Sequence, residues 1–168
     1  MDGNGRWAVD RGLSRSAGHI QGAKVVKEVI SAATELSLET LTLYAFSTEN
    51  WNRPKEEVDG LMDLLVRTIA GEVKELHDSG VSLKAIGDLN GLPNNCNDEL
   101  QLAIKKTKNN TDINLVLALN YSSRWEMTQA TKRIAKDVLA GKISAEDIND
   151  DMIAANMSTA DLPDPELL

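Results

Sequence analysis

The stretch Leu41-Thr42-Leu43-Tyr44-Ala45-Phe46-Ser47-Thr48-Glu49-Asn50-Trp51-Asn52-Arg53-Pro54 passes from an apolar run to a polar one and ends on a proline. Residues 41–46 have the profile of a buried parallel strand. Pro54 suits the first turn of a helix, because the N–H that it lacks would have no partner there. The acidic side chains that follow suit the positive end of such a helix: Glu56, Glu57 and Asp59. The stretch therefore predicts a strand, a polar corner and a helix, in that order.

The rest of the chain repeats this alternation of strand and helix patterns. Apolar spacing and start signals predict further strands over 81–86 and 113–119, and helices over 17–36, 54–77, 97–108, 123–140 and 144–156. Such an order is typical of βαβ units with right-handed crossovers. The sequence predicts an α/β fold, with a mostly parallel central sheet flanked by helices. Ligands of such sheets bind outside the carboxyl ends of the strands, so residues 47–53 and 120–124 are predicted to line that rim.

Length and charge narrow the class of protein. The 168 residues show no repeat or linker and predict a single domain over 1–168. A net charge of −8 argues against a nucleic-acid binder, although cationic side chains gather early: Arg6, Arg11, Arg15, His19 and Lys24. The single cysteine, Cys96, suits a reducing compartment, and no apolar run approaches the ~20 residues of a membrane span. We expect a cytoplasmic protein.

A second stretch, Met1-Asp2-Gly3-Asn4-Gly5-Arg6-Trp7-Ala8, mixes residue types that folding alone rarely needs together. Gly3 and Gly5 allow positive φ angles and a close approach of backbone N–H groups to a ligand. Arg6 offers a planar fork of donors to phosphate oxygens. Asp2 is an oxygen ligand of the kind that Mg²⁺ binds alongside substrate phosphates. The alternative is a polar turn with a helix cap, since a Gly-x-Gly pair alone is weak evidence.

Three segments of the chain resemble the signatures of the cis-prenyltransferases, the undecaprenyl diphosphate synthase family. They are the octapeptide of residues 1–8, the segment Arg15-Ser16-Ala17-Gly18-His19 and the block of residues 43–54. The resemblance implies Mg²⁺-dependent condensation of isopentenyl diphosphate onto an allylic diphosphate such as farnesyl diphosphate. The product would be a long-chain polyprenyl diphosphate, the lipid carrier of cell-wall (peptidoglycan) synthesis. It further implies a homodimer that touches the membrane peripherally through its lipid product.

Roles for the first group of residues follow from the chemistry and the resemblance. Backbone N–H groups at Gly3, Asn4 and Gly5, with the side chains of Arg6 and Arg15, would hold the allylic diphosphate. His19 lies four residues beyond Arg15, close enough to share one anion, although a lone His near a helix start is more often a capping or core residue. By resemblance, Asp2 is the catalytic aspartate and the Mg²⁺ ligand.

In the second block the resemblance implies contact of Arg53 with isopentenyl diphosphate. Ser47 and Asn50 would place the condensing carbon, and Asn50 would accept or relay the lost proton, although an amide is a poor base. Thr48 and Glu49 belong to the same substrate-binding block. Trp51 and Trp7 would shield the developing carbocation, or else simply fill the core. The helix over 55–77 carries enough apolar residues either for core packing and a subunit contact or for the wall of a hydrophobic tunnel.

Family members carry a strand before the opening motif and a later segment that adds arginines and a Mg²⁺ carboxylate. We therefore expect this chain to be an incomplete domain, truncated at both ends. Two alternatives stay open: a non-catalytic substrate-binding or partner subunit on the same scaffold, and generic nucleotide binding. The latter lacks any Gly-Lys-Ser/Thr phosphate loop. Ser37 and the pair Ser122-Ser123 depart from the glycines common in the family, and Ser37 would be strained if it is left-handed.

Overall fold

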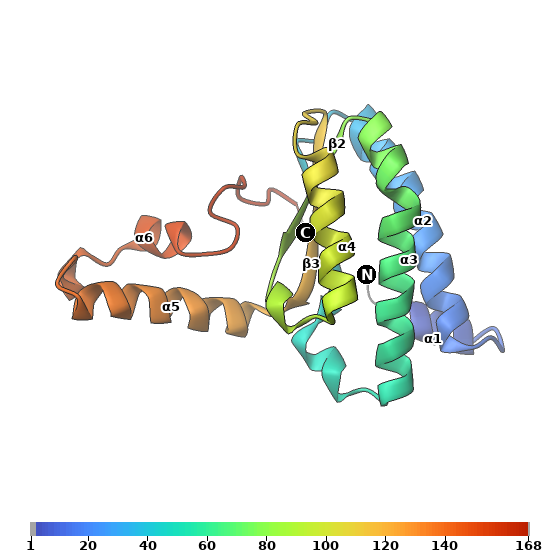
Figure 1. Cartoon of the computed structure of the whole chain (residues 1–168), viewed down its shortest axis with the longest axis horizontal. Coiled ribbons are helices and arrows are strands. Elements are labelled where there is room, and N and C mark those ends of the chain that lie inside the picture. Colours follow the sequence, from blue (N-terminus) through green and yellow to red (C-terminus); the bar gives the residue numbers. More distant parts are fainter. Residues whose placement is uncertain (1–2, 168) are drawn as a thin grey trace. The chain divides into compact units, whose positions relative to one another are not determined.

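The structure, a computed structural model, describes residues 3–167 and divides into two compact units, Met1–Asn120 and Tyr121–Leu168. The first unit contains α1 (Asn4–Val9), α2 (Arg15–Glu35), β1 (Thr40–Ser47), the 3₁₀ turn η1 (Thr48–Asn52), α3 (Lys55–Asp78), β2 (Val81–Ile86), η2 (Leu89–Gly91) and α4 (Asn94–Thr107), and nearly all of β3 (Ile113–Tyr121) (Figure 1). The second unit contains α5 (Ser123–Leu139), η3 (Ala145–Asp147) and α6 (Asp150–Ala155). The prediction of one domain over 1–168 stays a prediction.

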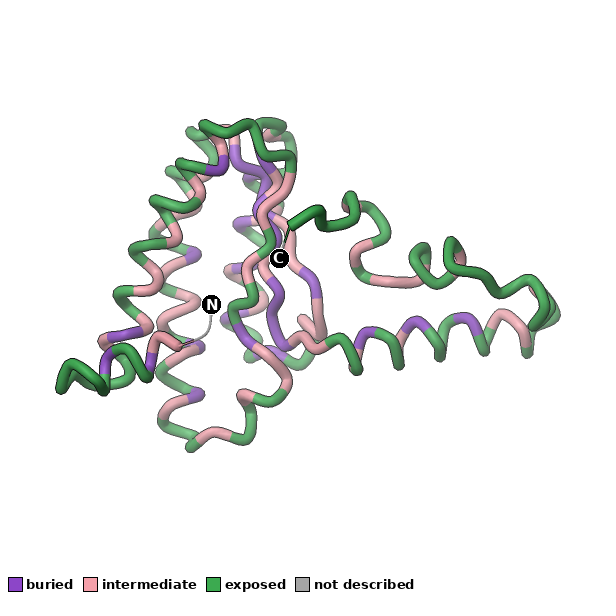
Figure 2. The backbone as a smooth tube through the Cα atoms, turned by 180° about the vertical axis from the view of Figure 1, so that it is seen from behind, coloured by how far each residue is buried: buried purple, intermediate pink, exposed green. Residues whose placement is uncertain are grey.

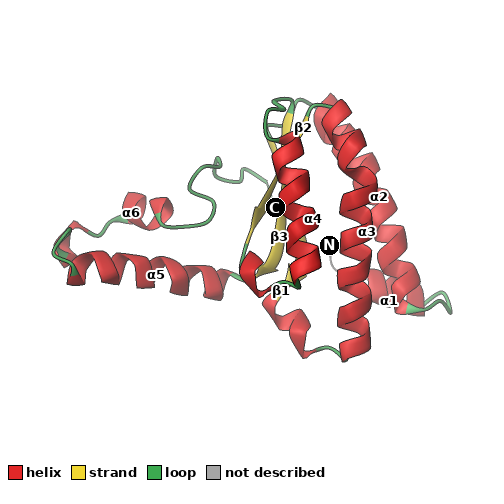
Figure 3. Cartoon of the chain, in the orientation of Figure 1, coloured by secondary structure: helices red, strands yellow, loops and turns green. Residues whose placement is uncertain are grey.

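The sheet of the first unit has the strand order β1-β3-β2 within the described residues. β2 and β3 are parallel, with a continuous register from Val81↔Ile113 to Ile86↔Ala118. α3 links β1 to β2 and α4 links β2 to β3, as a crossover of parallel strands requires. Figure 3 shows α4 beside the strands and α2 and α3 running side by side. The predicted α/β class with a parallel sheet flanked by helices is confirmed.

The core gathers on the two strands β2 and β3. Figure 2 shows buried residues concentrated along these strands, whereas α2 and α3 carry mostly half-buried and exposed ones. Leu83 and Leu119 are almost fully buried, and Leu100 and the free thiol of Cys96 on α4 pack into the same cluster. β1 is less buried than its apolar sequence predicts, because it is an edge strand of the described sheet and leaves Tyr44 57% exposed.

The predicted strands and long helices are confirmed with small shifts at their ends. α2 begins before Ala17 because the side chain of Ser14 accepts the N–H of Ala17 and caps the helix. At the other end of α2, Ser37 has φ 56, so this serine adopts the left-handed conformation that strains a residue other than glycine. The N–H groups of Ser37 and Leu38 donate to Thr34 O and Ala33 O, which is the Schellman pattern that glycine normally completes.

Two segments differ from the sequence-based expectation. Residues 4–9 form a short helix, which the sequence did not predict. Gly3 has a positive φ of 87, as expected of this motif, whereas Gly5 is helical. The helix predicted over 144–156 is wrong as one element, because a second cap interrupts it. Ser144 starts only the turn η3, and the side chain of Asn149 then accepts the N–H of Met152 and starts α6.

The second unit is held together by a buried carboxylate. Glu126 on α5 is 1% exposed and accepts hydrogen bonds from the hydroxyl of Tyr121 at 2.5 Å and from the backbone N–H of Ser158 at 2.8 Å. Ser122, in the position of a family glycine, has φ −149 and caps α5 through the N–H of Trp125. A glycine is therefore not needed at this position.

Candidate functional site

The polar corner that follows β1 is built by a capping box. The N–H of Ser47 donates to Oδ1 of Asn50 at 3.0 Å, and the side chain of Ser47 accepts in return from the backbone of Asn50. This reciprocal pair fixes the side chain of Asn50. Because Oδ1 of Asn50 accepts from Ser47, Nδ2 is the group of this amide that the capping box does not use.

Trp51 ties the same corner to the end of β3. Its Nε1 donates to Oδ1 of Asn120 at 2.8 Å, and its ring packs edge-on against Phe46 with centroids 5.0 Å apart. Asn120 is buried, with a left-handed φ of 48, and its Nδ2 donates to Asp88 O. The carboxyl ends of β1 and β3 are thereby held together, which confirms that residues 47–53 and Asn120 share one rim.

A close helix crossing positions the first motif against α2. A Cβ atom built on Gly18 would lie 2.0 Å from Asn4 O, and one built on Gly22 would lie 2.4 Å from Asn4 Nδ2. Only glycine allows the backbone of α1 to approach α2 this closely. The crossing places the side chain of Asn4 beside His19, on the same turn of α2 as Gly18.

Two side chains of α2, Arg15 and His19, converge at this corner with Arg53 and with Glu57 of α3. Nη1 of Arg53 lies 2.9 Å from Oε1 of Glu57, and Nη1 of Arg15 lies 3.8 Å from the same oxygen. Burial lowers the pKa of His19, and the nearby charges of Arg53 and Arg15 lower it further against the opposing effect of Glu57. The imidazole is therefore neutral at pH 7, and its buried Nε2 has no hydrogen-bond partner among the described residues. A buried unpaired ring nitrogen beside two arginines is the arrangement expected of an anion site that awaits its ligand.

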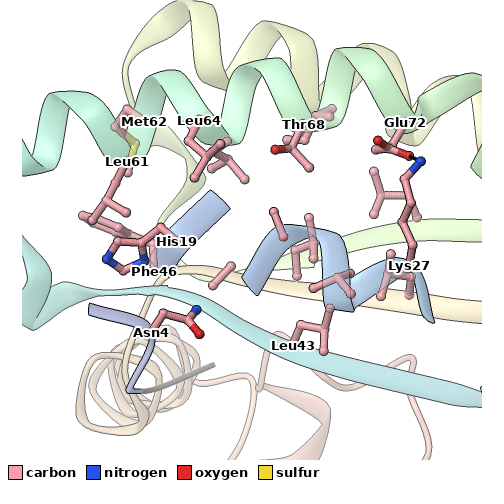
Figure 4. Close-up of a pocket in the computed structure, with 18 of the residues that line it drawn as sticks. Asn4, His19, Lys27, Leu43, Phe46, Leu61, Met62, Leu64, Thr68 and Glu72 are labelled. Atoms are coloured by element: carbon pink, nitrogen blue, oxygen red, sulfur yellow. Dashed lines mark ion pairs between the residues drawn. The ribbon is translucent and has the colours of Figure 1, made fainter. Parts of the chain in front are cut away.

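His19 and Arg53 line one end of a pocket of about 190 Å³ in the first unit. The volume far exceeds the ~10–15 Å³ that one water molecule needs. In Figure 4, His19, Asn4 and Met62 lie at one end, Thr68 and Leu43 lie along the middle, and the ion pair of Lys27 and Glu72 lies at the other end. The walls between the two ends are mostly apolar side chains of α2, α3 and the three strands, among them Val26, Ile30, Leu61, Leu65, Ile69, Leu115 and Leu117.

The structure brings four of the predicted site residues to the pocket itself, namely Asn4, His19, Asn50 and Arg53. Arg15 joins them through Glu57, and its side chain lies within 3.5 Å of the Cβ position of Gly5. The other predicted residues do not line the pocket; they lie in α1 and at its N-cap, at the end of β1 and in η1: Gly3, Arg6, Trp7, Ser47, Thr48, Glu49 and Trp51. Trp7 is 39% exposed beneath the guanidinium of Arg11, 4.5 Å from its ring centroid. Asp2 lies outside the described residues.

The described residues do not build a metal cage of their own. Within residues 3–167 no group of three or more His, Cys, Asp or Glu side chains is placed to hold a metal ion. Mg²⁺ is usually held by one or two carboxylates together with substrate phosphates, so a site completed by Asp2 and a bound diphosphate fits this chemistry. The assignment of Mg²⁺ to Asp2 stays a prediction.

Sequence reasoning missed two kinds of site residue. Gly18 and Gly22 act by making room for Asn4, and their spacing of four residues on one helix face was the available signal. Asn120 acts by holding Trp51, and no local pattern pointed to that contact. The sequence predicts Glu57 only as an acidic residue at the start of a helix, whereas in the structure it bridges Arg53 and Arg15.

Comparison with known proteins agrees with this geometry. A family described as "Putative undecaprenyl diphosphate synthase" matches residues 1–168. An isoprenyl transferase of Clostridium perfringens is 48% identical over all of this chain, and one of Porphyromonas gingivalis is 48% identical over 99% of it. The chain spans 66% of the length of each of these curated relatives.

Two solved structures share the fold. Lavandulyl diphosphate synthase from Lavandula x intermedia, in complex with dimethylallyl diphosphate, superposes with a TM-score of 0.92 at 33% identity, covering 95% of this chain and 69% of that one. A "probable undecaprenyl diphosphate synthase" from Campylobacter jejuni gives 0.72 at 32% identity, covering 82% of this chain and 63% of that one. No helix within residues 3–167 is long and apolar enough to cross a membrane.

Proposed function

Because the chain belongs to the undecaprenyl diphosphate synthase family, we propose that its protein is a cis-prenyltransferase, which joins isopentenyl diphosphate to an allylic diphosphate. The observation that carries this proposal is the shape and polarity of the pocket. One end presents His19, Asn50 and Arg53, and the body is apolar. An allylic diphosphate has the same division, with an anionic head and a hydrocarbon tail.

The polar end supplies what the departing diphosphate needs. Arg53 and Arg15, both oriented by Glu57, face developing negative charge with donors that are already in place. The neutral His19 can donate one N–H to the anion, and a bound diphosphate would raise the pKa of this imidazole toward its ordinary range. The Nδ2 group of Asn50 adds a further donor, so we assign Asn50 to substrate orientation, and the resemblance adds the relay of the lost proton.

The apolar walls serve the hydrocarbon half of the reaction. They exclude water from the allylic carbon, where positive charge develops as diphosphate leaves. Each buried methylene of the tail contributes ~0.8 kcal/mol to binding. When bound, Mg²⁺ would supply Lewis-acid neutralisation of the leaving group, with Asp2 as its protein ligand.

Other parts of the proposal rest on the family alone. We extend it to farnesyl diphosphate as starter, a long-chain polyprenyl diphosphate as product, and a role of that product as a cell-wall lipid carrier. The same holds for a homodimer in the cytoplasm that reaches the membrane through its product. The substrate class is supported by the two related structures, a lavandulyl diphosphate synthase in complex with dimethylallyl diphosphate and a probable undecaprenyl diphosphate synthase.

The test is product formation by the full-length protein with farnesyl diphosphate, radiolabelled isopentenyl diphosphate and Mg²⁺. Arg53→Ala is expected to lower kcat/KM by ~10- to 100-fold, because a charge-assisted hydrogen bond contributes ~1.5–3 kcal/mol. The matched control is Lys55→Ala, which removes a cation two residues away whose side chain is 91% exposed. Absence of both turnover and allylic-diphosphate binding in the unmodified protein would refute the proposal. Binding without turnover would instead favour a non-catalytic subunit.

A further inference from the structure

The turn η1 carries the pocket residue Asn50 and ends next to Arg53, yet none of its own residues is buried. The capping box joins Asn50 to Ser47, only three positions away, so it fixes the shape of the turn but not its place against the sheet. Trp51 supplies that second constraint, because its Nε1 donates to Oδ1 of Asn120 on β3, 2.8 Å away. The position of two pocket residues therefore depends on one indole.

Asn120 is itself anchored to the buried part of the sheet. Its side chain and backbone are 6% exposed, and it lies on β3 beside the end of β2. The carbonyl of Asn120 accepts the N–H of Asp88 at 3.2 Å, and Nδ2 of Asn120 donates to the carbonyl of Asp88 at 2.9 Å. This reciprocal pair holds the amide against backbone that cannot rotate away. The chain of contacts from Asp88 through Asn120 to Trp51 therefore fixes an exposed turn to the two most buried strands.

The partners of Asn120 require a carboxamide at this position. The indole N–H of Trp51 can only donate and the carbonyl of Asp88 can only accept, so the side chain between them must offer one acceptor and one donor. The φ of 48 adds a separate requirement, because asparagine is among the few residues other than glycine that adopt left-handed backbone readily. The backbone alone would accept glycine, whereas the two hydrogen bonds would not.

Gly91 in η2 leaves the space that this amide occupies. A Cβ atom built on Gly91 would lie 2.6 Å from Nδ2 of Asn120 and 3.1 Å from Oδ2 of Asp88. The φ of Gly91 lies outside the left-handed region, so its backbone would suit other residues and only the missing side chain matters. The shape of η2 is thus fitted to the amide of Asn120, which supports its role independently of the hydrogen bonds.

We propose that Asn120 is a positioning residue for prenyl transfer, which acts through Trp51 to hold η1 so that Asn50 and Arg53 meet the reacting diphosphates in a productive geometry. The proposal rests on the prenyl-transfer function proposed above. Asn120 does not line the pocket, so it acts on the reaction only through its neighbours. The anion-binding side chains of α2 do not depend on this link, so its loss affects turnover more than substrate binding.

The test measures kcat and KM of the full-length protein with farnesyl diphosphate, isopentenyl diphosphate and Mg²⁺. Asn120→Gly removes the amide and suits a φ of 48. It is expected to lower kcat by ~10- to 100-fold, with KM for the allylic diphosphate changed by less than ~3-fold. Trp51→Phe keeps an aromatic ring, removes the N–H donor and is expected to lower kcat in the same way. The two losses should not add in the double variant, because both variants break one hydrogen bond.

The matched control is Asn114→Ala. This asparagine also lies on β3 and ties it to the start of β1, through Glu39 O at 3.3 Å and Thr40 Oγ1 at 3.4 Å, away from η1. Its loss is expected to lower the stability measured in urea and to leave kcat unchanged.

Gly91→Ala approaches the same amide from its other side. The added Cβ is expected to displace Asn120 and lower kcat several-fold, whereas Gly71→Ala, whose Cβ meets nothing within 4 Å, leaves kcat unchanged. If Asn120→Gly does not fold, this pair of alanine variants decides the question, and unchanged kcat in Gly91→Ala overturns the proposal.

A purely structural role of Asn120 would change unfolding in urea without changing kcat of the folded enzyme. The proposal is therefore overturned if folded Asn120→Gly retains its kcat, if Asn114→Ala loses as much, or if the losses in the double variant add.

The indole N–H resonance of Trp51 gives a readout that needs no turnover, and its absence from the NMR spectrum of Trp51→Phe assigns it. If the unmodified protein makes no product, the proposed function fails and this resonance tests the positioning role. Inorganic diphosphate must then shift the resonance in the unmodified protein, because an anion at Asn50 and Arg53 alters the hydrogen bond between Trp51 and Asn120. It must leave the resonance unshifted in Asn120→Gly, and any other result overturns the proposal.

Discussion

Substitution of Gly18 by alanine tests whether the α1–α2 crossing positions the candidate site. The added Cβ would lie 2.0 Å from Asn4 O and 3.0 Å from Cβ of Ala8. The first of these atoms is a backbone oxygen that cannot rotate away, so α1 would have to move by roughly 1 Å or more to reach an ordinary contact. Since α1 carries Asn4, the change would displace one side of the pocket's polar end.

The expected change in the free energy of unfolding of Gly18→Ala follows from two opposing effects. Alanine in place of glycine in a helix gains ~1 kcal/mol of intrinsic propensity. Overpacking costs ~1–3 kcal/mol, and more when backbone is the obstacle. We expect a net loss of ~1–2 kcal/mol in the free energy of unfolding. A displacement of this size in a binding group can lower turnover by up to ~10²-fold.

Urea unfolding, monitored by tryptophan fluorescence, measures the change in stability. Steady-state kinetics, which give kcat/KM for the allylic diphosphate, measure the change in turnover. The control is Gly71→Ala, also within a helix, where an added Cβ meets nothing within 4 Å. That variant is expected to gain ~0.5–1 kcal/mol in unfolding free energy with unchanged kinetics. If Gly18→Ala behaves like Gly71→Ala in both measurements, the crossing does not position the site and the reasoning is refuted.

Three further predictions concern single groups. Ser37→Gly should raise the unfolding free energy by ~0.5–1 kcal/mol, because φ 56 is free of strain only for glycine; no gain in urea melts would contradict the Schellman assignment. NMR titration should place the pKa of His19 below the ordinary histidine value, and diphosphate should raise it; a pKa of His19 that does not respond to diphosphate would contradict its place in the anion site. Because the folded pKa of His19 is depressed, its contribution makes the unfolding free energy fall as the pH drops through the unfolded value near ~6.5. Glu57→Gln should weaken diphosphate binding several-fold, because it releases Arg53 and Arg15. The free energy of unfolding should change by under ~1 kcal/mol, since both ion pairs are partly exposed. Equal diphosphate affinity of the variant and the unmodified protein in calorimetry would contradict this role of Glu57.

Strands and long helices were predictable because their signals are local. The apolar run before Ser47 and the proline at 54 mark β1 and the start of α3 without any knowledge of their neighbours. The position of Arg53 and Asn50 at the rim followed, because a parallel sheet places the carboxyl ends of its strands together.

The short helix α1 was not predictable in the same way. Asn4 and Gly5 are poor helix formers, and the helix exists because Gly18 admits it against α2, a tertiary contact that leaves no local periodicity. The interruption between η3 and α6 has a different cause. Ser144 and Asn149 both offer side-chain caps, and a sequence pattern does not say which of two caps ends the first helix.

The rate at which a thiol reagent labels Cys96 reports how often the core opens. Cys96 is the one thiol in this sequence, it is 0% exposed on α4, and burial raises its pKa above the ordinary thiol value. A disulfide reagent can reach the sulfur only while α4 separates from the sheet, so the labelling rate counts those openings rather than fluctuations of the surface. Ligands that bind in the pocket should stabilise the packed core and slow this labelling. The labelling rate therefore measures occupancy of the pocket without any turnover.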